Sequence, residues 1–504
     1  MDRSLISAFL SLLGARVATS AISLVALPVV VRLLGDSGYG NYGFLMSTFS
    51  LLMILVSSGV TEGVQKFVAE SRSDPEWRSH VVGFYLRVAL LLGAVGSLLL
   101  AAVTATGVVA RVLSPPFTAY FYLLAVFVIA SQLRAFTRRT MMGLGLERYS
   151  EPLKVVRKLV WILLGVALVF RGLGVAAFLL SSIAGEFLFA VVGFAIVLRR
   201  LEPSVIFGRR PASFPTRELL SFNGLNIVLV LFFLSLFHVD VMMLRLLTSG
   251  AETGLYKAAL AIAEYVWFVP LVLQSLLLHS SSALWSDGEL DRITSLSARL
   301  TRYVLLLTTL MALGLMVLAD RFLPLYFGAE FSGAVTPLLL LLPGTLGFAL
   351  ARPLYAVNQG SGRLRPLIAV TSVAALANVV LNALLIPAYG NVGAAMATSV
   401  GYGSMFVLQA GCARYLGYDP LADLRAFRVV LTALLTGPAI YLVDGAIPDP
   451  LVALAVVPPV GAFVFAVAAV LTGAVDADEI RIATRRLPGP LRSRIDAVLP
   501  SEDV

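Results

Sequence analysis

The stretch VRLLGDSGYGNYG (residues 31–43) has a second, altered copy further along the chain, and this repetition decides the fold that we expect. The copy, LRLLTSGAETGLYKAA (residues 244–259), keeps Arg-Leu-Leu, a short polar turn and a Gly-x-Tyr that opens the next helix. Arg245 is thereby the counterpart of Arg32. In a chain of 504 residues, a motif that returns close to the midpoint predicts two similar halves.

Two further pairs of stretches follow in the same order and at nearly the same distance. They are MMGLGLER (141–148) with NQGSGRLR (358–365), and GLGVAAFLLSS (172–182) with GNVGAAMATS (390–399). The first pair aligns Gly143 with Gly360, and the second aligns Gly174 with Gly393. Three matches at a nearly constant offset indicate an internal duplication.

The composition places the duplicated chain in a membrane. Hydrophobic residues make up 59% of it, charged residues only 13%, and the mean hydropathy is +0.91, whereas soluble domains have about 25% charged residues. Continuous apolar runs predict helices, because the strands of a membrane barrel would alternate in hydropathy. We count about fourteen apolar segments: 5–34, 39–61, 81–109, 117–140, 153–170, 173–198, 222–247, 254–279, 300–319, 334–357, 366–387, 391–414, 427–444 and 451–473.

Six of these segments separate the two copies, and an even number gives both copies the same orientation. We therefore predict an all-α membrane protein with two six-helix lobes, related by a parallel pseudo-two-fold repeat and enclosing a cavity, plus two C-terminal helices. The predicted parts are the N-lobe (1–200), a cytoplasmic linker (201–220), the C-lobe (221–416), the last two helices (417–475) and a cytoplasmic tail (476–504).

The basic residues orient these helices. With the N-terminus inside, 31 of the 38 Lys and Arg residues flank the inner side, six flank the outer side, and Arg16 lies within a segment. This asymmetry is the one that the positive-inside rule predicts, so both termini are expected in the cytoplasm of a cell whose plasma membrane holds the protein. The net charge of +9 comes without a basic stripe interleaved with aromatics, and nucleic acid is not an expected partner.

Three stretches resemble a known family. They are RLLGDSGYGNYGF (32–44), GVTEGVQKFVAE (59–70) and HVDVMMLRLLTSGAETGLYKAA (238–259). They are similar to the polysaccharide-transporter branch, with Wzx-type oligosaccharide flippases, of the multidrug/oligosaccharidyl-lipid/polysaccharide flippase superfamily. The resemblance implies a two-lobed bundle that moves lipid-linked sugars across the membrane by alternating access. It places the family's recurrent Asp on Asp240 and its Gly-x-Tyr on Gly254 and Tyr256. Related lipid II flippases carry an Arg-Asp pair where this chain has Ala-Leu-Pro at 26–28, which disfavours a peptidoglycan precursor as cargo.

Three arginines are candidates for binding the phosphate of such a lipid. Arg16 falls near the middle of the first apolar segment, where a charge is costly unless it faces water, protein or ligand. Alternatively, the first residues lie along the interface and Arg16 snorkels to the cytoplasmic edge. Arg87 and Arg134 lie within about two turns of the cytoplasmic face and would widen a basic entrance, or act only as topology anchors.

Four titratable residues in predicted spans are candidates for coupling transport to H⁺ or Na⁺, or for forming ion pairs. They are Glu186, Asp240, Glu264 and His238. Asp240 and Glu264 are expected at similar depth on adjacent helices, as a proton site or as a structural pair with Arg245 or Lys257. For His238, interfacial hydrogen bonding is the alternative to a proton relay.

Other classes of protein are weighed against these residues. No Lys follows Gly, so no phosphate-binding loop for ATP is present, and no Cys/His constellation predicts a metal or other cofactor. The sequence Asp476-x-Asp478 faintly resembles the DxD of sugar transferases, and a membrane glycosyltransferase or polymerase is the least favoured alternative; we expect no enzyme activity. A multidrug or cation antiporter of the same superfamily is the main alternative. We expect a monomer whose partners are the lipid-linked oligosaccharide, membrane lipids and glycan polymerase or transferase enzymes.

Overall fold

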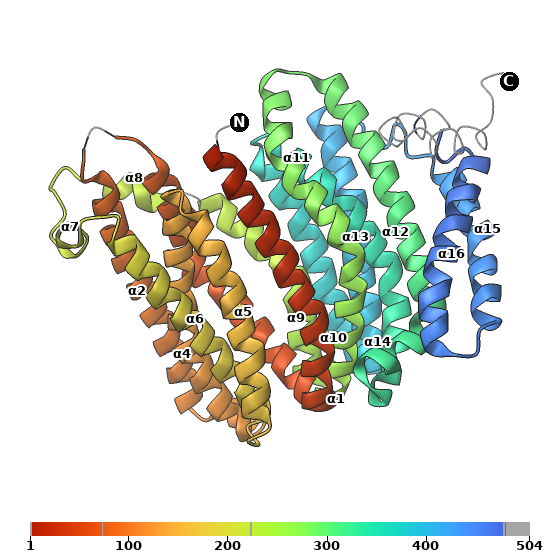
Figure 1. Cartoon of the computed structure of the whole chain (residues 1–504), viewed down its shortest axis with the longest axis horizontal. Helices are drawn as coiled ribbons and strands as arrows, with labels where there is room; N and C mark the ends of the chain where they lie inside the picture. The colour runs from red at the N-terminus through yellow and green to blue at the C-terminus, as the bar shows by residue number, and fades with distance from the viewer. Residues whose placement is uncertain (1–2, 73, 222–223, 477–478, 480–504) are drawn as a thin grey trace. The chain divides into compact units, whose positions relative to one another are not determined.

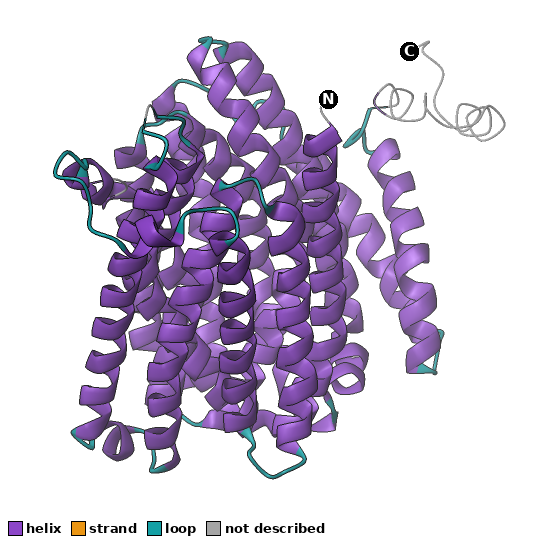
Figure 2. Ribbon diagram, turned by 60° about the vertical axis from the view of Figure 1, so that its left-hand side comes forward, coloured by secondary structure: helices purple, strands orange, loops and turns teal. Residues whose placement is uncertain are grey.

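A computed structural model describes residues 3–72, 74–221, 224–476 and 479 of the chain. The side chains of residues 3–17, 58, 220–221, 224–226 and 279 lie outside the described set. Every regular element in the described ranges is a helix, and none is a strand (Figure 2). The all-α fold that the composition predicts is therefore confirmed.

The helices follow one another with short connections (Figure 1). The first ten are α1 (Arg3–Ala69), α2 (Trp77–Ala105), α3 (Val108–Val112), α4 (Pro116–Gly143), α5 (Glu147–Val169), α6 (Val175–Leu198), α7 (Pro203–Phe207), α8 (Thr216–Ser221), α9 (Gly224–Leu247) and α10 (Gly250–Ala263). The rest are η1 (Glu264–Trp267), α11 (Phe268–Ser286), α12 (Leu290–Phe327), η2 (Ala329–Ala334), α13 (Val335–Gly360), α14 (Leu364–Leu416), α15 (Ala426–Gly445) and α16 (Pro450–Leu471).

Within the described ranges, each of the fourteen apolar segments falls mainly on helical residues, but two pairs of segments are joined. Helix α1 holds the first two segments and bends at Gly35 (φ 65°), while α14 holds the eleventh and twelfth and bends at Gly390 (φ 56°). Glycine adopts these left-handed values because it lacks a Cβ. Eleven helices in the described ranges are long and apolar enough to span a membrane. Helix α5, with Lys154, Arg157 and Lys158 in its middle, is not among them. The number fourteen stays a prediction.

The duplicated stretches share unusual backbone conformations. Gly145 and Gly362, which are as far apart along the chain as the aligned Gly143 and Gly360, have φ of 69° and 71°. Gly174 (φ 48°, ψ −125°) matches Gly390 (φ 56°, ψ −131°). The sequence alignment pairs Gly174 with Gly393 instead. The backbone conformations therefore place the equivalent residue three positions earlier, at Gly390. The equivalent turns of the two copies thus have the same geometry.

The chain forms two compact units. The first comprises residues 1–258 and 371–398, and the second residues 259–370 and 399–504. In the first, the buried Trp77 indole donates to the Phe67 carbonyl at 2.9 Å. In the second, the Trp267 indole donates to the Thr345 carbonyl at 2.9 Å and packs against Phe348. Each unit therefore has its own core. The lobe boundaries expected from the repeat remain a prediction.

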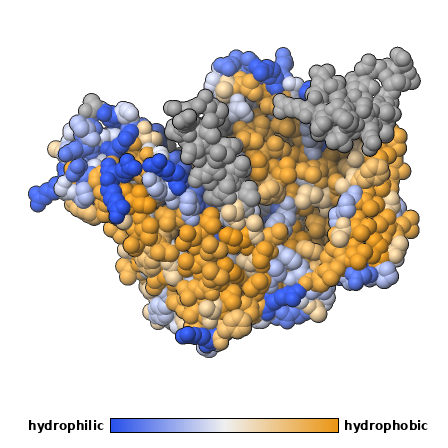
Figure 3. Space-filling model, viewed as in Figure 1, coloured by the Kyte–Doolittle hydropathy of each residue, from blue (hydrophilic) through white to orange (hydrophobic). Residues whose placement is uncertain are grey.

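The surface of the first unit has the banded pattern of a membrane protein. On the face drawn in Figure 3, hydrophobic residues cover the middle of the helices, and hydrophilic residues gather around α7 and α8 and at the opposite helix ends. Exposed large hydrophobic side chains such as Leu98, Leu163 and Val191, each at least 67% exposed, lie mid-helix. Such surfaces are stable in lipid rather than water.

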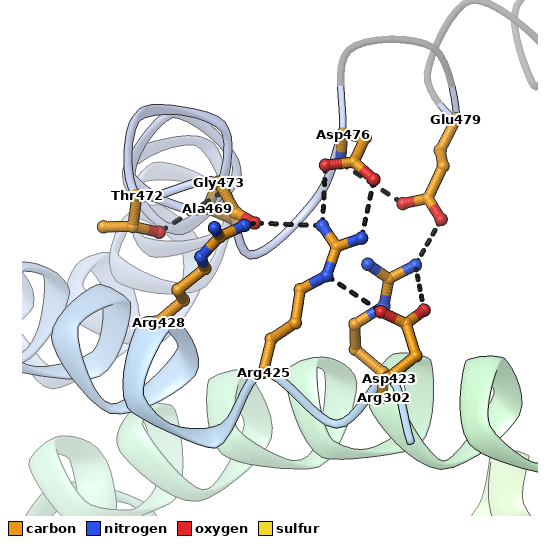
Figure 4. A network of polar contacts seen from close by, with 9 residues as sticks. All are labelled: Arg302, Asp423, Arg425, Arg428, Ala469, Thr472, Gly473, Asp476 and Glu479. Carbon is orange, nitrogen blue, oxygen red and sulfur yellow. Dashed lines mark hydrogen bonds and ion pairs between the residues drawn. The ribbon is translucent and has the colours of Figure 1, made fainter. Parts of the chain in front are cut away.

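An ionic network joins the last two helices to α12 in the second unit (Figure 4). The fully buried guanidinium of Arg302 in α12 pairs with Asp423 at 3.2 Å and with Glu479. Arg425, at the start of α15, makes a bidentate contact with Asp476 at 2.6 and 2.7 Å. This guanidinium lowers the pKa of the Asp476 carboxyl. The network fixes the segment after α16 by charge pairing.

Candidate functional site

A cluster of charged side chains lies where α4, α5 and α6 pack together in the first unit. Glu186, near the middle of α6, has only 4% of its side chain exposed. Its carboxylate pairs with the guanidinium of Arg134 from α4 and with that of Arg157 from α5, the latter at 3.0 Å. Burial of a carboxylate at mid-helix is costly unless it is paired, and here two cations pair with it. We name Arg134, Arg157, Lys158 and Glu186 the cation cluster.

The fourth member, Lys158, has no carboxylate partner within the described residues. Its ammonium lies 3.9 Å from the centroid of the Trp161 ring, one turn further along α5. By contrast Lys154, one turn earlier, pairs with the fully buried Glu151 at 3.0 Å, and Arg138 pairs with the same carboxylate at 2.7 Å. The cation cluster thus contains three cations and one acid, an excess of two positive charges.

Close packing of α5 on α6 holds the cation cluster in place. A Cβ added at Gly185 would lie 3.1 Å from both the Cγ and the carbonyl oxygen of Arg157. The missing side chain therefore lets the Arg157 backbone approach α6, one residue before Glu186. Trp161 contacts Phe178 of α6, with ring centroids 5.7 Å apart. These contacts fix the positions of the charged groups on neighbouring helices.

The second predicted cation, Arg87, lies outside the cation cluster. The Arg87 guanidinium donates to the carbonyl of Ile206 at 3.3 Å and to that of Gly208, so it holds α7 and the following loop against α2. The side chain of Arg16 lies outside the described residues, and its role stays a prediction. Of the three, only Arg134 is seen among other intramembrane charges.

A second buried carboxylate, Asp240 of α9, has different neighbours. It is fully buried and accepts hydrogen bonds from the Tyr256 hydroxyl, from Thr398 at 3.1 Å and from the Val241 amide at 2.7 Å. In the described part of the chain it makes no ion pair. Of the two cations expected as alternative partners, Arg245 donates from its Nε to Asn41 Oδ1 at 2.6 Å, and Lys257 interacts with Asp240 electrostatically without forming a salt bridge.

Two amides of α14 extend this polar group. Asn378 Nδ2 donates to Thr398 Oγ1 at 3.4 Å, and Asn382 Nδ2 donates to the Asn378 carbonyl at 2.9 Å. Both Oδ1 atoms are buried and have no hydrogen-bond partner within the described residues. We name Asp240, Tyr256, Thr398, Asn378 and Asn382 the oxygen cluster. Its unsatisfied amide oxygens are costly to bury and are free to accept from a further donor or to bind a cation.

The remaining candidates do not join either cluster. The Nδ1 atom of His238 is buried without a partner in the described ranges. Glu264 opens η1 in the second unit, where it interacts electrostatically with Arg352. The Arg352 guanidinium also donates to Gln274 at 3.0 Å and lies over the rings of Trp267 and Phe348 at 4.8 and 5.0 Å.

Several of these residues were not among the predicted site residues. Arg157, Lys158 and Arg352 read as topology anchors in the sequence, because they lie near the predicted inner flanks of their segments. For the first two, a signal was available: three cations, Lys154, Arg157 and Lys158, lie within five residues of one apolar helix and are followed by Trp161. Thr398 gives no such signal, because a single Thr in an apolar helix is common.

These features define a class of protein: an all-helical, multi-pass membrane protein of the multidrug/oligosaccharidyl-lipid/polysaccharide flippase superfamily, in its polysaccharide branch. Residues 5–271, slightly more than half of the chain, match the family described as "Polysaccharide biosynthesis protein". The chain belongs to this family, and the resemblance seen in the sequence motifs is confirmed.

Relatives with known descriptions agree with this assignment. The "Probable low-salt glycan biosynthesis flippase Agl15" of Haloferax volcanii is 23% identical over 398 residues, which cover 78% of this chain and 79% of that protein. Among solved structures, the "Lipid II flippase MurJ, inward closed conformation" has a TM-score of 0.70 at 14% identity, covering 92% of this chain and 98% of that one. An inward-facing multidrug resistance MATE family transporter has a TM-score of 0.66 at 14% identity, covering 80% and 96%.

Proposed function

We propose that the protein carries a lipid-linked oligosaccharide, a glycan on polyprenyl phosphate or pyrophosphate, from the cytoplasmic to the outer leaflet of the plasma membrane. Alternating access moves the cargo, which serves the assembly of cell-surface polysaccharide or glycan. The single observation that carries this proposal is the excess of two positive charges in the cation cluster, whose half-buried cations surround the buried Glu186. The names of the relatives support it, since one is described as a glycan biosynthesis flippase and another as a lipid II flippase.

The cation cluster suits the chemistry of such a cargo. Phosphate oxygens bind guanidinium groups through paired charge-assisted hydrogen bonds and bind ammonium groups as point charges. Arg157 and Lys158 supply one of each, as neighbours on α5. The glycan cannot cross hydrocarbon unaided, because each hydroxyl without a partner costs a few kcal/mol. A fixed positive site inside the bundle would compensate the phosphate charge.

The alternatives are less well supported by the same residues. A multidrug antiporter would carry an organic cation, which the excess positive charge around Lys158 repels. A transferase or polymerase would need the Asp476 carboxylate for a metal, yet this carboxylate is bound by Arg425. The other acid of that motif, Asp478, lies outside the described residues. The flippase assignment therefore remains the best supported.

We also propose that the oxygen cluster binds the coupling cation, H⁺ or Na⁺. Carboxylate, hydroxyl and amide oxygens are the ligands of hard cations. The cluster offers the Asp240 carboxylate, the hydroxyls of Tyr256 and Thr398, and the two unpartnered amide oxygens of α14. A bound Na⁺ would satisfy these oxygens; alternatively, a proton would neutralise the carboxylate.

A flipping assay on one matched pair of variants tests the cargo assignment. Purified protein is placed in vesicles with a polyprenyl pyrophosphate-linked oligosaccharide, and an added glycosidase reports the glycan on the far leaflet. Because a charged hydrogen bond contributes about 1.5–3 kcal/mol, Lys158→Gln is expected to lower the rate roughly tenfold or more. Lys154→Gln, which removes a cation already paired with Glu151, is the control and stays near wild type. Equal rates for Lys158→Gln and wild type, or transport of a drug cation in place of the glycan lipid, contradict the proposal.

A further inference from the structure

The short helix α7 lies at the edge of the first unit and packs on α2 (Figure 1). A Cβ added at Gly83 of α2 would clash with the carbonyl oxygen of Ile206, so the missing side chain lets the α7 backbone approach closely. The Arg87 guanidinium donates to the same carbonyl and to that of Gly208. Ile206 itself is buried. These contacts fix the position of α7 on α2.

The same contacts relate α7 to the lipid-facing surface of α2. This helix is buried almost throughout Trp77–Leu86, whereas Leu90 and Leu98 are 47% and 69% exposed. The apolar surface that α2 turns to lipid therefore begins near Leu90. Arg87, which holds α7, lies three residues earlier, about 4.5 Å along the helix axis. Helix α7 thus lies within one helical turn of the lipid-facing surface.

A large apolar side chain of α7 is left exposed at this level. Phe207 is 62% exposed, although the neighbouring Ile206 is buried. An exposed phenylalanine gains nothing from water, because its apolar area stays hydrated. Short segments that carry such a ring beside basic residues are typical of the membrane interface, where the ring reaches the ends of the acyl chains.

Exposed arginines flank α7 on both sides in the sequence. Arg199 and Arg200 follow the last residue of α6, and Arg209 and Arg210 follow α7. Within the described residues, none of these arginines pairs with a carboxylate. Glu202 is the one acid of the stretch 199–210, so four arginines leave an excess of three positive charges. We name the following residues the basic collar: Arg199, Arg200, Phe207, Arg209 and Arg210.

We propose that the basic collar binds anionic phospholipid headgroups on the side of the membrane that is predicted to be cytoplasmic. Guanidinium groups bind phosphate oxygens through paired charge-assisted hydrogen bonds. Clusters of arginine next to a membrane helix are attracted to anionic lipid. Phe207 inserts among the acyl chains below these headgroups. Since α7 lies in the connection between α6 and α9, lipid binding anchors this connection at the membrane surface.

Fluorescence quenching tests where α7 lies. Phe207→Cys is made in a Cys412→Ala background, since Cys412 is the chain's one native cysteine. The variant is labelled with bimane and placed in vesicles of phosphatidylcholine, with or without phosphatidylglycerol. Ala212→Cys, an exposed position further along the same loop, is the matched control. Nitroxide on the lipid chains is expected to quench the label at 207 severalfold more than the label at 212, and dissolved iodide to show the reverse.

Lipid composition tests the headgroup. Phosphatidylglycerol is expected to increase the lipid-borne quenching at 207 severalfold, and high salt to remove this increase, because salt screens charges at a surface. A combined variant is expected to lose the increase as well: Arg199→Gln, Arg200→Gln and Arg209→Gln. A matched control removes the same charge from exposed arginines of the second unit and should keep the increase: Arg299→Gln, Arg363→Gln and Arg365→Gln.

Two results would overturn the proposal. If iodide quenches the label at 207 as strongly as the label at 212 in every vesicle, the collar faces water and fits an acidic soluble partner in place of a membrane. If lipid-borne quenching at 207 is the same with and without phosphatidylglycerol, or if the combined variant keeps the full increase, the arginines do not bind anionic headgroups. No cargo is present in these measurements, so their outcome does not depend on the proposed function.

Discussion

Glu186 and Asp240 are both buried carboxylates of the first unit, yet their neighbours differ in kind. Glu186 contacts two guanidinium groups, and Lys158 lies close by without an acid of its own in the described ranges. Asp240 contacts hydroxyls and a backbone amide and has no ion pair among the described residues. Among guanidinium groups a carboxylate stays charged and acts as a counter-ion. Among hydroxyls and amides it can exchange a proton or another cation at little structural cost.

The largest expected effect separates the two carboxylates by their response to an ion gradient. Asp240→Asn removes the one charge of the oxygen cluster, so the flipping rate should no longer respond to an imposed Na⁺ or H⁺ gradient. The rate is measured in vesicles with each gradient in turn, which also identifies the ion. Thr398→Ser keeps the hydroxyl ligand and is expected to keep the response, whereas Thr398→Val loses it. A gradient response that survives in Asp240→Asn would remove the oxygen cluster from the coupling mechanism.

A smaller effect is expected on stability, and here the Glu186 variant should be more affected than the Asp240 variant. Glu186→Gln leaves the half-buried Arg134 and Arg157 without their counter-ion, and removal of one partner costs at most about 3–5 kcal/mol, the range for a fully buried pair. Asp240→Asn keeps an oxygen for the Tyr256 and Thr398 hydroxyls, so the expected loss is about 1 kcal/mol or less. Melting curves of the two purified variants in detergent give the comparison. Equal losses of stability would mean that the two carboxylates contribute equally to the folded structure and would contradict this comparison.

Much of the fold could be predicted from the sequence because its signals are periodic and redundant. Three independent signals predict the same helical bundle with two similar halves. They are the fourteen apolar segments, the repeated motif and the asymmetric distribution of arginines. What the sequence could not supply is conformation at single residues. Helix α14 bends at Gly390 (φ 56°), and the sequence alone does not distinguish this glycine from the nearby Gly393.

The candidate site was predicted less completely, because a charge in a helix does not show which way its side chain points. Glu186 and Arg134 were both expected inside the membrane, and the structure brings them together. Arg157 and Lys158 were interpreted as interfacial anchors because they lie close to the predicted inner end of their apolar segment. Arg87 was expected either at the cargo entrance or as a topology anchor, and the structure adds that it donates to the carbonyls of Ile206 in α7 and Gly208 after it.

The smallest effect concerns a carboxylate that water reaches. Asp476 is paired with Arg425 like Glu186 with its arginines, but 47% of its side chain is exposed, so solvent screens the pair and its contribution is expected to be under about 1 kcal/mol. Since Arg425 lowers the pKa of Asp476, the charged form stabilises the fold above the unfolded pKa of about 3.9, and this stabilisation is lost as the pH falls through the lower folded value. The melting temperature of wild type should therefore exceed that of Asp476→Asn slightly at pH 6. The difference should begin to shrink as the pH falls below about 3.9 and vanish only below the lower folded pKa, where both proteins are neutral at this position. A difference that grows on acidification would contradict the pairing and would make the exposed carboxylate a different case from the buried Glu186.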